Sequence, residues 1–172
     1  MKRVSTIKIV RASLFMAMTM VATLFIRIPI PLGYVNLGDA FVLLSAFILG
    51  PVYGVIAAGV GSALADLVGY ASYAPGTLII KALMAFVACV IYIALAKTTK
   101  KPLIAEIVAS VTGAVVMTAG YFIYESLLFV TPAVAWANCA YNILQGLVGA
   151  AIAVSTMRVL CATRLLEKIN RD

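Results

Sequence analysis

Long apolar runs separated by short polar segments divide the chain into six predicted helices. A helix needs about 17–25 apolar residues to cross a bilayer. The runs predict helices over residues 8–27, 37–49, 53–70, 77–96, 103–130 and 134–160. The second run is short for a bilayer, so either the preceding loop covers it or it does not span the full thickness. We therefore expect residues 1–172 to form a single domain, an all-α integral membrane protein with six transmembrane helices.

Proline and glycine mark the segments between these runs. Residues 27–38 contain two prolines and two glycines. Because proline disfavours helix at its own position and the one before it, this segment is expected to be an extended outer loop. Gly50-Pro51 predicts a tight turn, and GYASYAPG over residues 69–76 predicts a polar turn between two helices.

Composition agrees with a lipid environment and fixes an orientation. The chain is 65% hydrophobic and only 11% charged, whereas a soluble domain has about a quarter charged residues. All of its 13 Lys and Arg residues except Arg27 and Lys81 lie at one face of the predicted bundle. The positive-inside rule places both termini in the cytoplasm. Because these bases lie at helix ends, they do not form a nucleic-acid-binding patch.

Most other polar side chains fall in the outer half of the predicted membrane span. They are Asp39, Asp66, Lys81, Tyr121, Glu125, Trp136, Asn138, Asn142 and Gln145. We expect the inner half to contain almost no polar side chains besides Ser and Thr. A proton or ion path would need polar groups at both depths, so the pattern predicts a pocket open to the outside. Amides and tyrosines suit a flat heteroaromatic ligand with hydroxyl groups.

One acid and one base flank the turn between the third and fourth predicted helices. Asp66 and Lys81 are equally distant from Tyr73, so antiparallel helices would place them face to face. A charge in an apolar helix costs about 2.5–3.5 kcal/mol and usually has a partner or a function. Either the two side chains only neutralise each other, or Lys81 contacts a ligand while Asp66 holds Lys81 charged and in position. The turn is then a candidate lid, with Tyr73 covering the ligand.

Several other candidates have a simpler structural interpretation. Trp136 suits an anchor at the membrane interface, and Asp39 suits a helix N-terminus. The small residues Ala12, Ser13 and Ala17 either pack inside the bundle or dock on another membrane protein. With three widely spaced cysteines and no histidine, we expect neither a zinc site nor a disulfide framework.

A resemblance adds a family to this interpretation. The stretch YVNLGDAFVLLSAFILGPVYGVIAAGVGSALADLVGYASYAPGTLIIKALMAFV, residues 34–87, follows a basic N-terminus and a first helix rich in small residues. It resembles the substrate-binding S component of energy-coupling factor (ECF) vitamin transporters. The similarity is to the riboflavin-type branch, which includes proposed hydroxymethylpyrimidine and pyridoxine carriers.

The resemblance implies binding without catalysis, no cofactor of its own, and a place in the cell membrane. Its implied partners are a transmembrane coupling protein and two cytoplasmic ATPases. It implies a pocket lined by the first outer loop and the last three helices, which here carry Asn36, Lys81, Tyr121, Glu125, Asn138, Asn142 and Gln145. The docking residues correspond to the first helix, where Ser13-xxx-Ala17 is nearest the family pattern. The chain contains no GxxxxGK[ST] phosphate loop, so ATP hydrolysis is assigned to the partners.

Two rival functions use the same residues differently. An intramembrane aspartyl protease would pair Asp39 with Asp66, but Asp39 is expected to lie shallower, at a helix start. A stand-alone secondary transporter usually shows inverted repeats, and the two halves of this chain show no convincing repeat.

Overall fold

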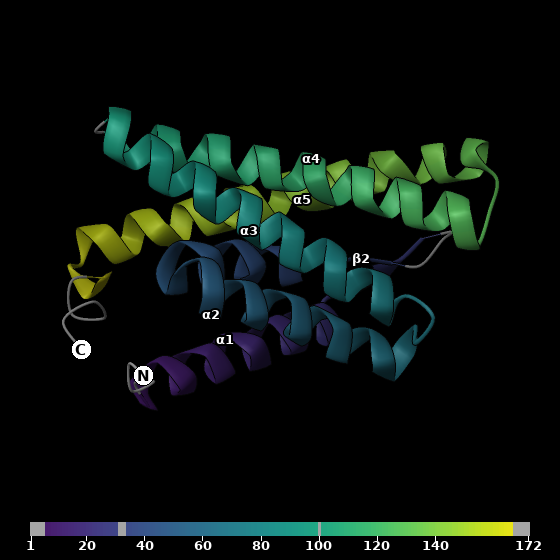
Figure 1. Cartoon of the computed structure of the whole chain (residues 1–172), viewed down its shortest axis with the longest axis horizontal. Coiled ribbons are helices and arrows are strands. Elements are labelled where there is room, and N and C mark those ends of the chain that lie inside the picture. The colour runs from purple at the N-terminus through teal and green to yellow at the C-terminus, as the bar shows by residue number, and fades with distance from the viewer. Residues whose placement is uncertain (1–5, 31–33, 100, 167–172) are drawn as a thin grey trace.

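A computed structural model describes residues 6–30, 34–99 and 101–166 of the chain. In this part the chain forms five long helices and one short hairpin (Figure 1). The helices are α1 (Thr6–Phe25), α2 (Gly38–Gly69), α3 (Ala74–Thr99), α4 (Pro102–Leu128) and α5 (Pro132–Ala162). Each is long and apolar enough to cross a membrane. The all-helical prediction is therefore confirmed.

Helix α2 replaces two of the six predicted helices. Gly50 has a φ of +79° and a non-helical conformation, which glycine adopts without steric cost, and Pro51 follows it. A Cβ added at Gly54 would lie 2.3 Å from the carbonyl oxygen of Ser45. In a straight helix these two residues would be separated by about 13 Å. Helix α2 thus folds back on itself at Gly50, and its segments 38–49 and 51–69 lie side by side.

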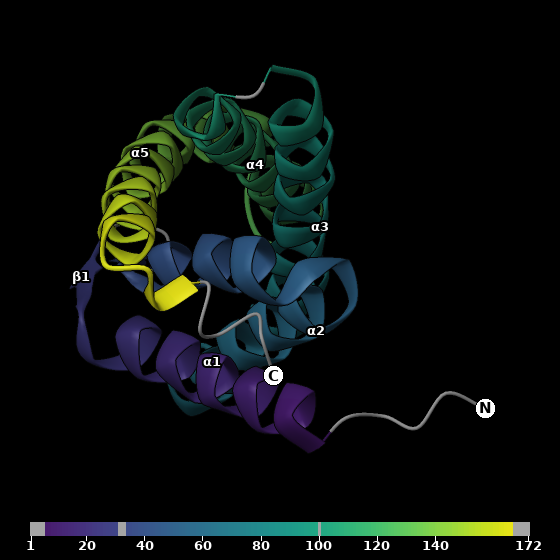
Figure 2. The same cartoon turned by 90° about the vertical axis from the view of Figure 1, so that its left-hand side faces the viewer.

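The helices form a ring in chain order, seen end-on in Figure 2. Helix α2 packs against α3, α3 against α4, α4 against α5, and α5 returns to α2, while α1 packs mainly on the outside of α2. Glycines permit the close contacts. A Cβ at Gly149 of α5 would lie 2.7 Å from the Cβ of Asp39, and one at Gly61 would lie 2.6 Å from the oxygen of Met16.

The predicted extended loop contains two short antiparallel strands, β1 (Arg27–Pro29) and β2 (Tyr34–Asn36). Arg27 pairs with Asn36, and Pro29 pairs with Tyr34. Strand β2 contacts α1 and α5. The hairpin lies at the end of the bundle opposite the start of α1 and the end of α5 (Figure 1).

The inner half of the bundle is more polar than expected. Glu106 of α4 is fully buried and forms an ion pair with Arg158 of α5. Ser110, one turn further along α4, is also buried and has no hydrogen-bond partner for its hydroxyl. The expectation that this half contains almost no polar side chains besides Ser and Thr did not include this buried ion pair. Glu106 and Arg158 are far apart in the sequence, and only the packing of α4 against α5 brings them together.

Candidate functional site

A polar pocket lies at the end of the bundle that carries the hairpin. It is lined by Thr23, Ile30, Tyr34, Asn36, Ser62, Asp66, Tyr70, Tyr73, Thr77, Lys81, Tyr121, Glu125, Asn138, Asn142 and Gln145. The space between these side chains is about 470 Å³ including the open mouth, and the centre of a water molecule can reach about 40 Å³ of it. Every predicted binding residue lines this pocket except Asp39 and Trp136. That the lining residues bind a ligand stays a prediction.

Lys81 pairs with Asp39, and the predicted direct pair of Lys81 with Asp66 is wrong. The Lys81 ammonium forms an ion pair with Asp39 Oδ1 and lies 2.9 Å from the sulfur of Met117. Gln145 Nε2 donates to Asp39 Oδ2 at 2.8 Å. The prediction compared only the two helices that flank the 69–76 turn, whereas the partner of Lys81 comes from the 38–49 segment of α2, which packs into the bundle.

Asp39 is deeper than a residue that only caps a helix. It is fully buried, and the residue at the N-cap position of α2 is Leu37, without a side-chain cap. Gln145 connects this buried pair to the hairpin, because its Oε1 accepts a hydrogen bond of 2.8 Å from the backbone N–H of Asn36. The network thus joins α2, α3, α5 and β2 beneath the pocket.

Asp66 lies on another wall and is paired with a tyrosine. The hydroxyl of Tyr34 donates a hydrogen bond to Asp66 Oδ1. Burial and the neighbouring carboxylate raise the pKa of Tyr34 well above its ordinary value, so this hydroxyl keeps its proton. The Tyr34 ring also packs on Tyr70, with centroids 5.0 Å apart, and the Arg27 guanidinium lies 5.6 Å from its centroid. Tyr34 was not among the predicted binding residues, although it lies two residues before Asn36, which was.

The amides of α5 face the pocket, as their spacing predicts. Asn138 Nδ2 donates to both carboxylate oxygens of Glu125, at 2.8 and 3.1 Å. Asn142 lies one turn further along α5 and is 8% exposed, and within the described part of the chain its buried Nδ2 has no hydrogen-bond partner. On the opposite side, Tyr121 and Thr77 bond through their hydroxyls at 2.9 Å.

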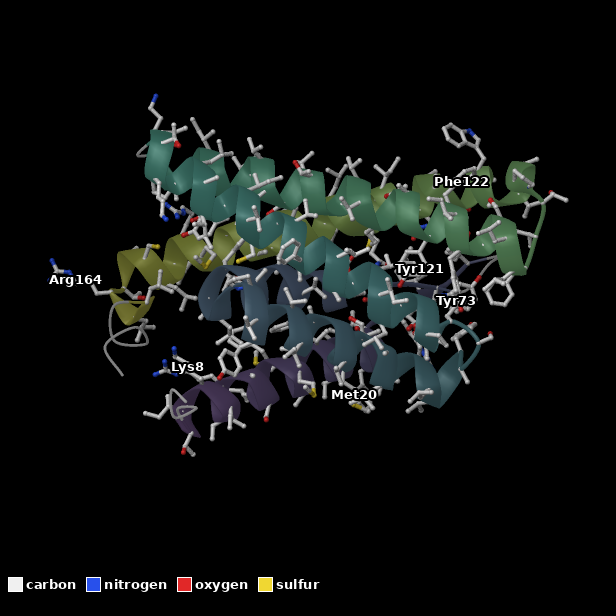
Figure 3. All side chains as sticks on the ribbon, in the orientation of Figure 1. Lys8, Met20, Tyr73, Tyr121, Phe122 and Arg164 are labelled. Carbon is white, nitrogen blue, oxygen red and sulfur yellow. The ribbon has the colours of Figure 1, made fainter. Side chains whose placement is uncertain are left out.

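The turn between α2 and α3 is held by aromatic contacts at the mouth of the pocket. The Tyr73 ring stacks on Phe129, with centroids 4.9 Å apart and planes 14° apart. The Tyr124 hydroxyl donates to the carbonyl of Ser72 at 2.7 Å. Burial, helped by the carboxylate of Glu125, raises the pKa of Tyr73 to about 12. Figure 3 shows Tyr73 and Tyr121 towards the same end of the bundle.

The comparisons with known proteins identify the family. The family model described as "ECF-type riboflavin transporter, S component" matches residues 3–167, nearly the whole chain. This chain belongs to that family of S components. The chain is therefore assigned to a membrane-embedded family of transporter components and not to an enzyme family.

A curated relative of the S component is similar over a shorter stretch. A protein from Pyrococcus woesei described as "Uncharacterized protein in gap 3'region" is 54% identical over 63 residues. The match covers 36% of this chain and 43% of the relative, so the chain spans less than half the length of that protein.

Trp136 of the S component points away from the pocket. Its side chain is 71% exposed and packs edge-on against Phe122, with centroids 6.0 Å apart. Both rings line an apolar groove on the outer surface of α4 and α5. Figure 3 shows Phe122 at the edge of the molecule, away from Tyr121. The prediction of Trp136 as a pocket residue is therefore not supported by its position, which suits an interfacial anchor.

The small residues of α1 separate into two faces. Ala12 is buried against the bundle, whereas Ser13 and Ala17 are exposed. Internal packing thus accounts for Ala12 only. Within the described residues, no three His, Cys, Asp or Glu side chains lie close enough to hold a metal ion.

Proposed function

We propose that this S component binds a small heteroaromatic vitamin or vitamin precursor from outside the cell. Hydroxymethylpyrimidine-like and pyridoxine-like compounds are the first candidates, and riboflavin and thiamine are the alternatives. The chain then delivers its ligand through a coupling protein and two ATPases. The chain has no phosphate loop of its own, so these partners hydrolyse the ATP.

Unpaired polar atoms in the pocket carry this proposal. The Thr23 hydroxyl, the Ser62 hydroxyl and the Asn142 Nδ2 are buried, belong to residues that line the pocket, and have no hydrogen-bond partner among the described residues. Buried polar groups nearly always have partners, because an unpaired one costs about 1–3 kcal/mol. Three of them, drawn from α1, α2 and α5, face the same space. A polar ligand or ordered water in that space would satisfy them.

The remaining lining supports a flat ring as the core of the ligand. Tyrosine rings supply stacking surfaces, and the amides of Asn138, Asn142 and Gln145 supply donors and acceptors around the edge. The open mouth adjoins the hairpin and the turn that carries Tyr73. The centre of a water molecule can reach only about 40 Å³ of the pocket. Entry of a vitamin-sized ligand would therefore require these two segments to move apart, which gives Tyr73 the role of a lid residue.

The distribution of basic residues supports an outward-facing mouth. The described bases at the opposite end are Lys8, Arg11, Lys97, Lys101, Arg158 and Arg164. Figure 3 shows Lys8 and Arg164 at that end. The other bases used in the prediction, at positions 2, 3, 100, 168 and 171, lie outside the described residues. We propose that the basic end is cytoplasmic, and that the two segments of α2 with the other four helices give six crossings.

The exposed strip on α1 supports docking on the coupling protein. Ser13 and Ala17 lie one turn apart on the face turned away from α2. Small side chains let a second helix approach closely in a membrane. Ala12, which is buried, would support this strip from behind rather than contact the partner.

Binding by the purified chain without ATP tests the proposed function. Mass spectrometry of ligand that co-purifies with the protein identifies the compound, and calorimetry measures its affinity. Asn142→Ala and Thr23→Ala should each weaken binding about tenfold, because each removes one hydrogen bond to the ligand. Thr112→Ala is the matched control, since the Thr112 hydroxyl is exposed and bonds its own helix at Val108.

Two outcomes would contradict the proposal. Wild-type affinity in both pocket variants would exclude this pocket as the binding site. Uptake by cells that lack the coupling protein and the ATPases would instead favour the stand-alone transporter.

A further inference from the structure

Among the described residues, two carboxylates of the pocket, those of Asp66 and Glu125, form no ion pair with a Lys or Arg. Lys81 lines the pocket, but its ammonium is paired with Asp39, so these two charges cancel. Among the described residues, no Lys or Arg nitrogen lies within ion-pair distance of Asp66 or Glu125. Asp66 accepts a hydrogen bond from Tyr34, and Glu125 accepts hydrogen bonds from Asn138, so these donors are neutral. The lining of the pocket thus carries two carboxylates and one ammonium, and that ammonium is already paired with Asp39.

These carboxylates are deeply placed and come from different walls. Asp66 of α2 is 4% exposed, and Glu125 of α4 is 2% exposed. A buried carboxylate is costly unless a positive charge or several donors compensate it. A ligand that brings a positive charge into the pocket would supply what the protein does not.

Aromatic rings of the pocket favour the same kind of ligand. The rings are those of Tyr34, Tyr70, Tyr73 and Tyr121. A cation within about 6 Å of a ring centroid is attracted by the electron-rich face of the ring. The Lys81 ammonium already lies 5.5 Å from the Tyr121 ring centroid. Tyr70 and Tyr73 have no such partner among the described cations.

Arg27 is the cation at the rim, and its charge attracts Asp66 from beyond ion-pair distance, as does that of Lys81. Its guanidinium lies over the ring of Tyr34, outside the lining of the pocket, and its side chain is exposed. Solvent and salt screen an exposed charge much more than a buried one. Arg27 therefore compensates Asp66 only in part and does not reach Glu125.

We propose that the ligand of this pocket is a cation, a heteroaromatic compound with a protonated amine or a positively charged ring nitrogen. Glu125 and Asp66 are the specificity-determining residues that bind its charge. This inference rests on the proposed function and narrows it, because it favours charged over neutral members of the same class.

Matched probes test the charge preference directly. Pyridoxamine and pyridoxine differ in one group, an aminomethyl that is protonated at neutral pH in the first and a hydroxymethyl in the second. Thiamine adds a permanent cation, and riboflavin adds a neutral ring system. Calorimetry on the purified full chain is expected to show that a cationic probe binds at least about tenfold more tightly than either neutral probe.

Variants then assign the preference to the two carboxylates. Glu125→Gln and Asp66→Asn should each weaken binding of the cationic probe by about 10- to 100-fold and change binding of a neutral probe much less. Glu106→Gln is the matched control, because it makes the same change in the same helix about 28 Å away. It should leave affinity unchanged. Thermal unfolding of each variant checks that it is folded.

The outcomes separate this inference from the proposed function. Tightest binding of riboflavin or pyridoxine leaves the proposed function in place and overturns the cationic preference. Undiminished binding of the cation by both pocket variants overturns the roles of Glu125 and Asp66. If none of the probes binds, the net charge of the co-purified ligand decides the preference. If no heteroaromatic compound co-purifies either, the proposed function is contradicted, and this inference with it.

Discussion

The ion pair of Lys81 with Asp39 connects two helical elements in the interior of the bundle. Both side chains are almost completely buried, and Gln145 holds the second oxygen of the carboxylate. Removing one partner of a buried pair leaves an uncompensated charge, which typically costs about 3–5 kcal/mol. The first role of Lys81 is therefore to neutralise Asp39 inside the protein, and a contact with a ligand would be additional.

Lys81→Met should therefore destabilise the protein by about 3–5 kcal/mol, because the Asp39 carboxylate loses its cation. Thermal unfolding in detergent measures the effect. The double variant Asp39→Asn with Lys81→Met removes both charges and keeps similar volumes, so it should regain more than half of the loss. A double variant that is less stable than Lys81→Met alone would show that the two charges are not coupled.

At the scale of elements, the fold-back of α2 decides which side chains meet. The Ser45 hydroxyl donates to the carbonyls of Val42, at 2.8 Å, and of Gly54, at 3.0 Å. This hydroxyl thus binds the two segments of α2 together. The close approach brings the start of α2, and with it Asp39, into the bundle. The fold-back is for this reason a condition of the pocket, although Gly50 lies eleven residues after Asp39, at the other end of the 38–49 segment.

Gly54→Ala should destabilise the fold by about 1–3 kcal/mol, because the new Cβ would meet the Ser45 backbone and force the segments apart. Chemical or thermal unfolding measures this loss. Gly69→Ala is the control, since its Cβ would meet only the flexible end of Arg27 at an exposed position. Equal stability of the two variants would contradict a tight fold-back.

At the scale of the whole molecule, α1 lies outside the ring of the other helices. Its outer face is free of contacts with the described part of the chain, whereas the pocket faces the end of the bundle. Ligand binding and docking on a partner would thus use separate surfaces. A change in one surface should leave the other intact.

Ala17→Trp should reduce assembly with the coupling protein and uptake in cells about tenfold or more, because a large side chain prevents close helix contact. Ligand affinity of the purified chain should stay unchanged. Ala151→Trp is a matched control, since Ala151 is an exposed alanine of α5. Co-purification of the ECF partners measures assembly. Normal assembly of the Ala17 variant would place the docking surface elsewhere.

Much of this organisation was predictable along the chain. Apolar runs predicted the helices, and the Gly50-Pro51 pair predicted the break within what is now α2. The spacing of Asn138, Asn142 and Gln145 predicted a shared face, and all three line the pocket. These features depend on local geometry, since helix periodicity and the conformation of Gly and Pro act over a few residues.

Three features were not decided by the sequence, because they depend on contacts between residues that are far apart in it. Lys81 pairs with Asp39 and not with Asp66, Trp136 faces outward, and Glu106 is buried with Arg158. Each depends on the rotation of one helix about its axis or on the folding of α2. The rotation of a helix about its axis is hard to predict from a membrane protein's sequence, because the residues that face lipid and those that face the core are both apolar.

The order of apolar and polar residues was enough to predict a membrane protein of long helices with a polar cluster towards the hairpin end. The reason is that lipid requires every backbone group to bond within its own helix, so hydrophobic length alone defines the spans. Which charges compensate each other became clear from the packing of the helices, which pairs Lys81 with Asp39 and Arg158 with Glu106. Electrostatic energy depends on distances between side chains, and these are set when α2 folds back and the ring of helices closes. Among the described residues, that pairing leaves Asp66 and Glu125 without an ion pair, which points to a positively charged ligand.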